Sequence, residues 1–116
     1  MKKRSPITTH VLDLTAGVAA KGVPVLLEKR VRGRWMTIGK SKTNADGRVE
    51  DLLGVGEKLV QTDYRLTFDI EAYRGKKGRD GFYPEAVVTF RIRDLKRHHH
   101  IPLLLSDFGY STYRGT

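Results

Sequence analysis

The chain alternates short runs of β-branched and aromatic residues with clusters of glycine, asparagine and aspartate, and this pattern restricts it to few folds. In residues 63–73 the apolar side chains recur at every second position, which is the period of a strand with one buried face. They are Tyr64, Leu66, Phe68, Ile70 and Ala72. Strand-like runs also cover residues 7–14, 23–31, 35–39, 48–52, 86–93, 98–105 and 110–114. About eight short strands separated by turns predict an all-β fold, an antiparallel sandwich or barrel.

Turn residues mark the connections between these runs. Residues 32–34 predict a tight connection and residues 44–47 a turn, because asparagine, aspartate and glycine tolerate left-handed backbone. Pro24 indicates an edge strand or the first residue of a strand, since proline donates no hydrogen bond to a ladder. Three glycines in residues 74–81 disfavour a long helix there, so the sequence predicts at most one short helix.

Length and composition are those of a single domain. We assign the domain to residues 7–116 of the 116-residue chain, after a basic extension of residues 1–6. The absence of cysteine excludes disulfides and thiolate metal sites. No apolar run reaches the roughly 18 residues that a membrane helix needs, and no secretory signal follows the basic start. We therefore expect no membrane partner and a cytoplasmic location.

The chain carries a formal net charge of +9, which raises the question of a nucleic acid or another anionic partner. The lysines and arginines are scattered, and acidic residues such as Glu28, Asp80 and Asp94 interrupt them. Aromatic residues are not interleaved with the basic runs, as they are in surfaces that stack on bases. We interpret most of the charge as solvated surface and expect no nucleic-acid partner.

The most unusual stretch is residues 98–116, which read HHHIPLLLSDFGYSTYRGT. If residues 98–105 form a strand, one face carries His98, His100, Pro102 and Leu104, and the other carries His99, Ile101, Leu103 and Leu105. Both faces are then apolar, whereas a half-exposed antiparallel strand has one polar face. One face packs into the core, so the other face is also expected to be covered, either by the other sheet or by another subunit. Pro102 and Leu104 share that face with His100, which favours a subunit.

Histidine and arginine are the residues best suited to chemistry in this sequence. It contains no cysteine, no G-x-S-x-G nucleophile elbow, no phosphate loop and no dinucleotide fingerprint. What remains is histidine acid–base catalysis on a water molecule, with arginine binding an anionic or enolate-like substrate. The candidates are His10 in mid-strand, Arg48 after the predicted turn, and the histidines of residues 98–100.

Each candidate also has a simpler interpretation. Taken alone, His10 is typical of a structural strand histidine, and Arg48 of a solvated surface arginine. His98 and His100 lie two positions apart on one strand and are spaced to share a zinc ion, with His10 as a third ligand. No nearby carboxylate stands out as a further ligand, and we predict a site without metal or other cofactor.

Four stretches, in order, resemble the transthyretin-related 5-hydroxyisourate hydrolase family. They are ITTHVLDLTAG, TNADGR, FYPE and the closing HHHIPLLLSDFGYSTYRGT, and the resemblance runs over about residues 7–116. The family closes on Tyr-Arg-Gly-Ser, and this chain closes on YRGT. The resemblance implies a transthyretin-like β-sandwich of two four-stranded sheets. It also implies a homotetramer with active sites at the dimer–dimer interface.

The reaction of this family opens the ring of 5-hydroxyisourate, an intermediate of urate degradation, with water. The product is 2-oxo-4-hydroxy-4-carboxy-5-ureidoimidazoline. The residues that match the family's catalytic positions are His10, Arg48 and His100. Those expected to bind the substrate or shape the pocket are Tyr113, Arg114, His98, Ser111 and Thr116. Which of the two catalytic histidines is the general base stays open.

The chain departs from the family pattern at a few positions. The family usually has tyrosine where this chain has His99, and serine where it has Thr116. His99 is expected to face away from His100, with little effect on the chemistry. Transthyretin, the hormone carrier, shares the fold but lacks the histidine–arginine set and the YRG ending. A non-enzymatic small-molecule carrier on the same fold is therefore the alternative function.

Overall fold

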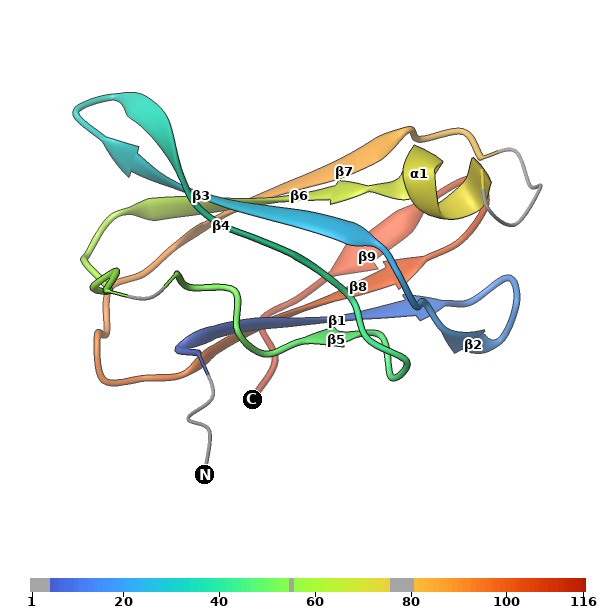
Figure 1. Cartoon of the computed structure of the whole chain (residues 1–116), viewed down its shortest axis with the longest axis horizontal. Helices are drawn as coiled ribbons and strands as arrows, with labels where there is room; N and C mark the ends of the chain where they lie inside the picture. Colours follow the sequence, from blue (N-terminus) through green and yellow to red (C-terminus); the bar gives the residue numbers. More distant parts are fainter. Residues whose placement is uncertain (1–4, 55, 76–80) are drawn as a thin grey trace.

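Two β-sheets lie face to face and enclose the core in this computed structural model, which describes residues 5–54, 56–75 and 81–116 (Figure 1). One sheet has the strand order β4-β3-β6-β7 and consists of β3 (Pro24–Val31), β4 (Arg34–Lys42), β6 (Asp63–Asp69) and β7 (Glu85–Arg91). The other has the order β2-β1-β8-β9 and consists of β1 (Ile7–Asp13), β2 (Val18–Ala19), β8 (His99–Leu105) and β9 (Tyr110–Thr112). A further short strand, β5 (Arg48–Val49), also pairs with β1. The predicted all-β sandwich is confirmed.

The second sheet is four strand positions wide although five strands contribute to it. One edge of β1 pairs with β8, and the other edge pairs with β5 at Thr9 and His10 and with β2 at Leu12 and Asp13. The strands β2 and β5 therefore share one position in the sheet. The sequence predicted a strand over residues 48–52 and no strand between residues 14 and 23. The first prediction was too long and the second missed β2, because two residues of each segment pair with β1.

The strands β1 and β8 run parallel, whereas the other pairs of described strands are antiparallel. The register joins Ile7 to His99 at one end and Asp13 to Leu105 at the other. A parallel pair needs a long crossover, and the rest of the sandwich supplies it here. Side-chain alternation reports which face a residue takes but not strand direction, so the sequence did not predict this pairing.

The core forms where the inward faces of the two sheets meet. Tyr64, Leu66 and Phe68 of β6 are 0% exposed, as the period-two pattern predicted. Burying such a side chain contributes about 1.5–3 kcal/mol each. The inward residues of β8 are His99, Ile101, Leu103 and Leu105, and all four are buried. The predicted division of the closing histidines between two faces is thus observed.

The predicted strand over residues 63–73 was wrong in its last part, because α1 (Ile70–Gly75) begins where β6 ends. The Asp69 carboxylate accepts a hydrogen bond from the Ala72 amide at 3.0 Å and caps the helix. Ile70 and Tyr73, three positions apart, are both buried. In the sequence, Ile70 continues the strand period, so this short amphipathic turn resembled a strand. In the described residues, no helix is long and apolar enough to cross a membrane.

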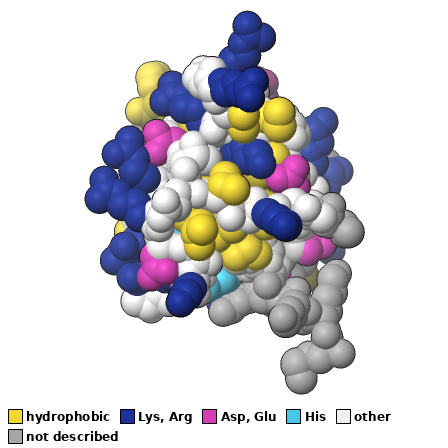
Figure 2. Space-filling model, turned by 90° about the vertical axis from the view of Figure 1, so that its left-hand side faces the viewer, with side chains coloured by type: hydrophobic (Ala, Val, Ile, Leu, Met, Phe, Trp, Pro, Cys, Tyr) yellow, Lys and Arg dark blue, Asp and Glu magenta, His cyan; other side chains and the backbone are white. Residues whose placement is uncertain are grey.

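The basic residues are spread over the surface. Figure 2 shows lysine and arginine side chains around one end of the sandwich, with acidic and apolar side chains between them. Of the predicted basic extension, residues 1–4 lie outside the described residues, as do residues 76–80 of the glycine-rich segment 74–81. Ser5 is buried, and its hydroxyl accepts hydrogen bonds from the amides of Ile7 and Leu53, both at 3.2 Å.

Candidate functional site

Three polar residues from distant parts of the sequence meet on the outer face of the sheet that contains β1. Strand pairing sets His10 opposite Arg48 of β5 on one side and opposite Pro102 of β8 on the other. One row along, Thr8 lies opposite His100. Directly opposed residues point to the same face of a sheet. Arg48, His10 and His100 therefore occupy neighbouring rows of one surface.

The turn before β5 positions Arg48. The Asn44 side chain accepts hydrogen bonds from the amides of Asp46 at 2.9 Å and Arg48 at 3.0 Å, which confirms the predicted turn. Gly47 has a φ of 75°, and a Cβ there would lie 2.4 Å from the carbonyl oxygen of Val11. The Gly47 carbonyl accepts a hydrogen bond from the Val11 amide at 2.7 Å. Only glycine fits this close approach, which presses the turn against β1.

The same turn fixes the ring of His10. Its Nε2–H donates to the carbonyl oxygen of Asp46 at 2.9 Å, so the neutral ring carries its lone pair on Nδ1. Burial lowers the pKa of His10 below its ordinary value, and the positive charge of Arg48 lowers it further. The contact with Asp46 opposes this shift. The neutral imidazole, which is the form able to accept a proton, is thus favoured near neutral pH.

A buried threonine hydroxyl joins the two outward histidines. Thr8 is 2% exposed, and its Oγ1 lies 2.9 Å from His98 Nε2 and 2.8 Å from His100 Nδ1. The two imidazole rings are nearly parallel, with an interplanar angle of 19° and centroids 6.4 Å apart. The predicted motif histidines therefore act on each other through Thr8, which the sequence analysis did not single out. The sequence did offer one indication: Thr8 stands two positions before His10, so both residues face the same side of the predicted strand.

The closing segment packs against His100. The Gly115 amide donates to the carbonyl oxygen of His100 at 2.8 Å. A Cβ at Gly115 would lie 2.7 Å from Cδ2 of the His100 ring, which is closer than side chains normally approach. Glycine in the YRGT ending therefore lets the chain end lie flat on the imidazole. We did not predict Gly115 as a site residue, although it stands inside the most specific motif of the chain.

A cavity of about 220 Å³ opens on this face. It is lined by Thr8, Thr9, Arg48, Glu50, His98, His100 and Thr116. The structure thus brings Arg48, His98, His100 and Thr116 of the predicted site residues together around one space. It places His10 beside them, opposite Arg48 in the sheet. Glu50 adds a carboxylate that sequence reasoning missed, because nothing in the local pattern separates it from a solvated surface residue.

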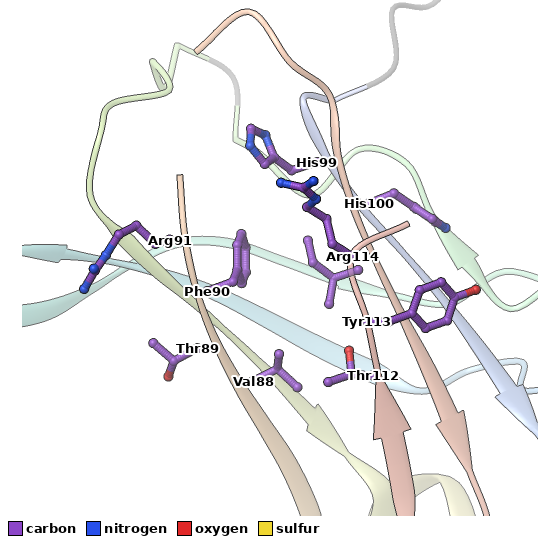
Figure 3. A pocket seen from close by; sticks show the side chains of 10 residues that line it. Val88, Thr89, Phe90, Arg91, His99, His100, Thr112, Tyr113 and Arg114 are labelled. Carbon is purple, nitrogen blue, oxygen red and sulfur yellow. The ribbon is translucent and has the colours of Figure 1, made fainter. Parts of the chain in front are cut away.

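The other predicted residues are divided between two surfaces. Tyr113 and Arg114 line a second cavity, of about 320 Å³, together with Val88, Phe90, His99 and other residues of β7 and the chain end (Figure 3). His100 also lines this cavity, and Figure 3 shows the side chains of His100 and Tyr113 turned away from those of His99, Arg114 and Phe90. Ser111 is exposed on β9, opposite Leu104. Burial, then the charge of Arg97, lowers the pKa of His99.

The histidines do not form a three-ligand group. In residues 5–54, 56–75 and 81–116, no set of three or more histidine, aspartate or glutamate side chains is placed to hold a metal ion. Within the same residues, no side chain forms an ion pair with Arg48. The site thus presents a guanidinium, imidazoles, threonine hydroxyls and the Glu50 carboxylate around a small cavity. This set can bind an anion or oxyanion and move a proton.

Residues 7–115 match the family model described as the HIUase/Transthyretin family. The chain is 42% identical over 110 residues to a probable 5-hydroxyisourate hydrolase of Caenorhabditis elegans, covering 95% of this chain and 81% of that protein. It is 40% identical over 114 residues to the 5-hydroxyisourate hydrolase of Mus musculus, covering 97% of this chain and 96% of the mouse protein.

Two kinds of solved structure share the fold. Sea bream transthyretin in complex with thyroxine superposes with a TM-score of 0.89 at 29% identity, over 97% of this chain and 96% of that one. Klebsiella pneumoniae 5-hydroxyisourate hydrolase superposes with a TM-score of 0.80 at 34% identity, over 95% of this chain and 98% of that one. The backbone is therefore common to a transthyretin and a 5-hydroxyisourate hydrolase, and the side chains of the site must distinguish them.

Proposed function

Because the chain belongs to the HIUase/transthyretin family, we propose that it is a hydrolase of urate degradation that opens 5-hydroxyisourate with water. Proteins named 5-hydroxyisourate hydrolase are about 40% identical to it over nearly its full length. One observation carries the proposal. The strands β1, β5 and β8 bring His10, Arg48 and His100, which match the catalytic positions of this family, to one outer face beside a cavity.

The reaction needs a water molecule to be deprotonated and a ring nitrogen to be protonated. Water attacks the C6 carbonyl of 5-hydroxyisourate while a histidine takes its proton, and the C6–N1 bond then breaks. A histidine returns one proton to N1, so the hydroxyl of water stays on C6 and its proton ends on the leaving nitrogen. A positioned acid–base group of this kind contributes about 100- to 10,000-fold in rate.

Arg48 and His10 have separate tasks in this proposal. The guanidinium of Arg48 borders the cavity without an ion-pair partner among the described residues, so it is available to stabilise negative charge on the substrate or intermediate. The neutral His10, held by Asp46 through Nε2, positions water or accepts a proton through Nδ1. The charge of Arg48 helps to keep His10 neutral, so the two residues support one another.

A direct assay tests the function. Urate is converted to 5-hydroxyisourate in situ, and the decay of its ultraviolet absorbance is followed with and without the purified protein. We expect rapid decay with the wild type and a rate close to the spontaneous one with the His10→Ala and His100→Ala variants. Wild-type rates in both variants would sink the proposal. Repeating the assay after exhaustive chelation separates a metal-free hydrolase from a zinc enzyme, because only the former keeps its activity.

We also infer that the protein is a homotetramer whose sites lie at a dimer–dimer interface. The face that carries His10 and His100 also carries Leu12 and Leu104, which lie opposite each other and are partly exposed. Apolar side chains beside the site favour burial of this face against another subunit. Light scattering after size exclusion measures the mass of the assembly, and a monomer at micromolar concentration would contradict the inference. A Leu104→Glu variant should dissociate the assembly without unfolding the sandwich.

A small-molecule carrier is the second candidate, because one neighbouring structure is a transthyretin described in complex with thyroxine. The outer face of β8 and β9, with Leu104 and Ser111 opposite each other, would line the binding channel. A carrier would bind an aromatic ligand saturably and show no turnover. The same ultraviolet assay therefore distinguishes the two functions, and hydrolysis at rates above the spontaneous decay rejects the carrier.

A further inference from the structure

Thr8 lies between the imidazoles of His98 and His100, and its hydroxyl restricts which nitrogen of each ring can carry a proton. Its Oγ1 lies within hydrogen-bond distance of His98 Nε2, at 2.9 Å, and of His100 Nδ1, at 2.8 Å. A hydroxyl has one hydrogen to donate, and it accepts through its lone pairs. Thr8 is 2% exposed, so water has little access to its hydroxyl. The proton positions of the two rings are therefore linked.

With both rings neutral, two arrangements satisfy the hydroxyl. In the first, His100 Nδ1–H donates to Thr8 and the Thr8 hydroxyl donates to His98 Nε2, which leaves the lone pair of His100 on Nε2. In the second, His98 Nε2–H donates to Thr8 and Thr8 donates to His100 Nδ1, which places the proton of His100 on Nε2. If both rings donated, the Thr8 proton would have neither ring as acceptor, and an unsatisfied buried donor is unfavourable.

We propose that Thr8 is a positioning residue that links the tautomers of His98 and His100 and relays a proton between them. The inference rests on the proposed hydrolysis for its consequence, but the linkage itself is a property of the three side chains. It assigns a role to His98, which also borders the cavity. In the first arrangement His100 is the base, because Nε2 carries its lone pair. In the second it is the acid, because Nε2 carries its proton.

The relay balances over one turnover. In the first arrangement His100 Nε2 takes the proton of water as the oxygen attacks carbon. His100 Nδ1–H then passes to Thr8, and the Thr8 hydroxyl proton passes to His98 Nε2, which makes His98 the cation. As the proton held by His98 returns through Thr8 to His100 Nδ1, His100 Nε2–H protonates the leaving nitrogen, so the ring stays neutral. This restores the starting state without any net proton gain.

A tautomer measurement tests the linkage without any assay of activity. In protein labelled with ¹⁵N-histidine, two-bond ¹⁵N–¹H correlations identify which nitrogen of each ring is protonated. We expect complementary tautomers in the wild type, with either Nδ1 of His100 or Nε2 of His98 protonated. Thr8→Val keeps the shape but removes the hydroxyl, and it should change the tautomer of at least one ring. Identical ring states in the wild type and Thr8→Val would overturn the proposal.

Thr43→Val is a matched control for the loss of a buried hydroxyl. Thr43 is 4% exposed, accepts a hydrogen bond from Val23 and donates one to Ala20, so its loss has a similar structural cost. It belongs to another part of the fold, and its variant should leave the tautomers of His98 and His100 as in the wild type. Altered tautomers in Thr43→Val would show a general packing effect and reject the specific role of Thr8.

Kinetics test the relay itself. Thr8→Val should lower kcat by about 10-fold or more, with KM nearly unchanged, and should shift the pH profile of kcat. Thr8→Ser restores the hydroxyl and should recover most of the rate. Changed tautomers with an unchanged kcat would overturn the relay. If wild-type protein shows no hydrolysis, the proposed function fails, while the tautomer measurement still decides whether Thr8 links the two rings.

Discussion

The outer faces of the two sheets differ in whether their arginines already have ion-pair partners. On the β3–β6 sheet, the Arg65 Nε donates to Glu28 at 2.8 Å, and the Arg91 Nε donates to Asp63 at 2.7 Å. The Arg65 guanidinium also lies 4.3 Å from the ring centroid of Trp35. These arginines have partners on their own surface. Because these arginines are already paired, they leave little charge for a ligand.

The outer face of the β1–β8 sheet is the opposite case. Arg48 faces a cavity and has no ion-pair partner among the described residues, and the nearby histidines bond to a hydroxyl and a backbone carbonyl. The net charge of the chain does not reveal this difference. What distinguishes a binding surface from a solvated one is whether its cations are already paired, and each prediction below tests this contrast.

The largest expected effect is the loss of His100. His100→Ala removes one of the two acid–base groups and should lower kcat/KM about 100- to 10,000-fold. Arg65→Ala, on the other sheet, removes a larger side chain and should leave the rate within about twofold. The ultraviolet decay of 5-hydroxyisourate measures both. Equal losses in the two variants would mean that the two faces do not differ in function.

A methyl group at residue 115 should have the next largest effect. In Gly115→Ala the new Cβ would lie 2.7 Å from Cδ2 of His100, so the ring must move. A displacement of this order at a catalytic group costs about 100-fold in kcat/KM. Gly109→Ala in the same closing segment is the control, because a Cβ there meets nothing closer than Ser106 Oγ at 3.7 Å. A rate for Gly115→Ala equal to that control would contradict the packing argument.

Removal of the Arg48 charge should change both rate and pH dependence. Arg48→Gln loses a charged hydrogen-bond donor of about 1.5–3 kcal/mol, and kcat/KM should fall about 10- to 100-fold. Because the Arg48 charge lowers the pKa of His10, its removal should raise that pKa toward the ordinary value. The acid limb of the rate profile should then move to higher pH. NMR titration of His10 checks the direction, with Arg65→Gln as the control that leaves it unchanged.

The sequence was informative where side-chain periodicity decides the structure. Alternation alone separated His99 from His100, and it identified the buried residues of β6. It was misleading at Ile70, where a strand period and the first turn of a helix place an apolar residue at the same position. Periodicity also says nothing of strand direction, so the parallel pairing of β1 with β8 came only from the structure.

Sequence periodicity does not show which strands pair, and this explains which site residues were missed. The resemblance to the family motifs indicated His10, Arg48 and His100, of which only the two histidines stand in apolar surroundings. Thr8 and Gly115 carry no such signal, since threonine is ordinary in a strand and glycine is ordinary near a turn. Their importance arises from contacts with His100 that depend on the register of β1 with β8 and on the path of the chain end.

The smallest expected effect concerns His99, which contrasts with His100 on the other face of the same strand. His99 is 7% exposed, and its Nδ1 has no hydrogen-bond partner in the part of the chain that the structure describes. Burial lowers its pKa in the folded state below the ordinary value of 6.5. As the pH falls through about 6.5, the unfolded chain takes up a proton on this ring before the folded chain does. His99 therefore destabilises the fold in mild acid.

His99→Phe removes both the titrating group and the unpartnered nitrogen. Its free energy of unfolding, measured with urea at pH 7.5 and 5.5, should differ less between the two pH values than that of the wild type. The variant should also be about 1 kcal/mol more stable at pH 7.5. Ile101→Leu repacks the same core without a titrating group and should keep the wild-type pH dependence. If His99→Phe keeps it too, the inward face of β8 does not contribute to the acid sensitivity of the protein.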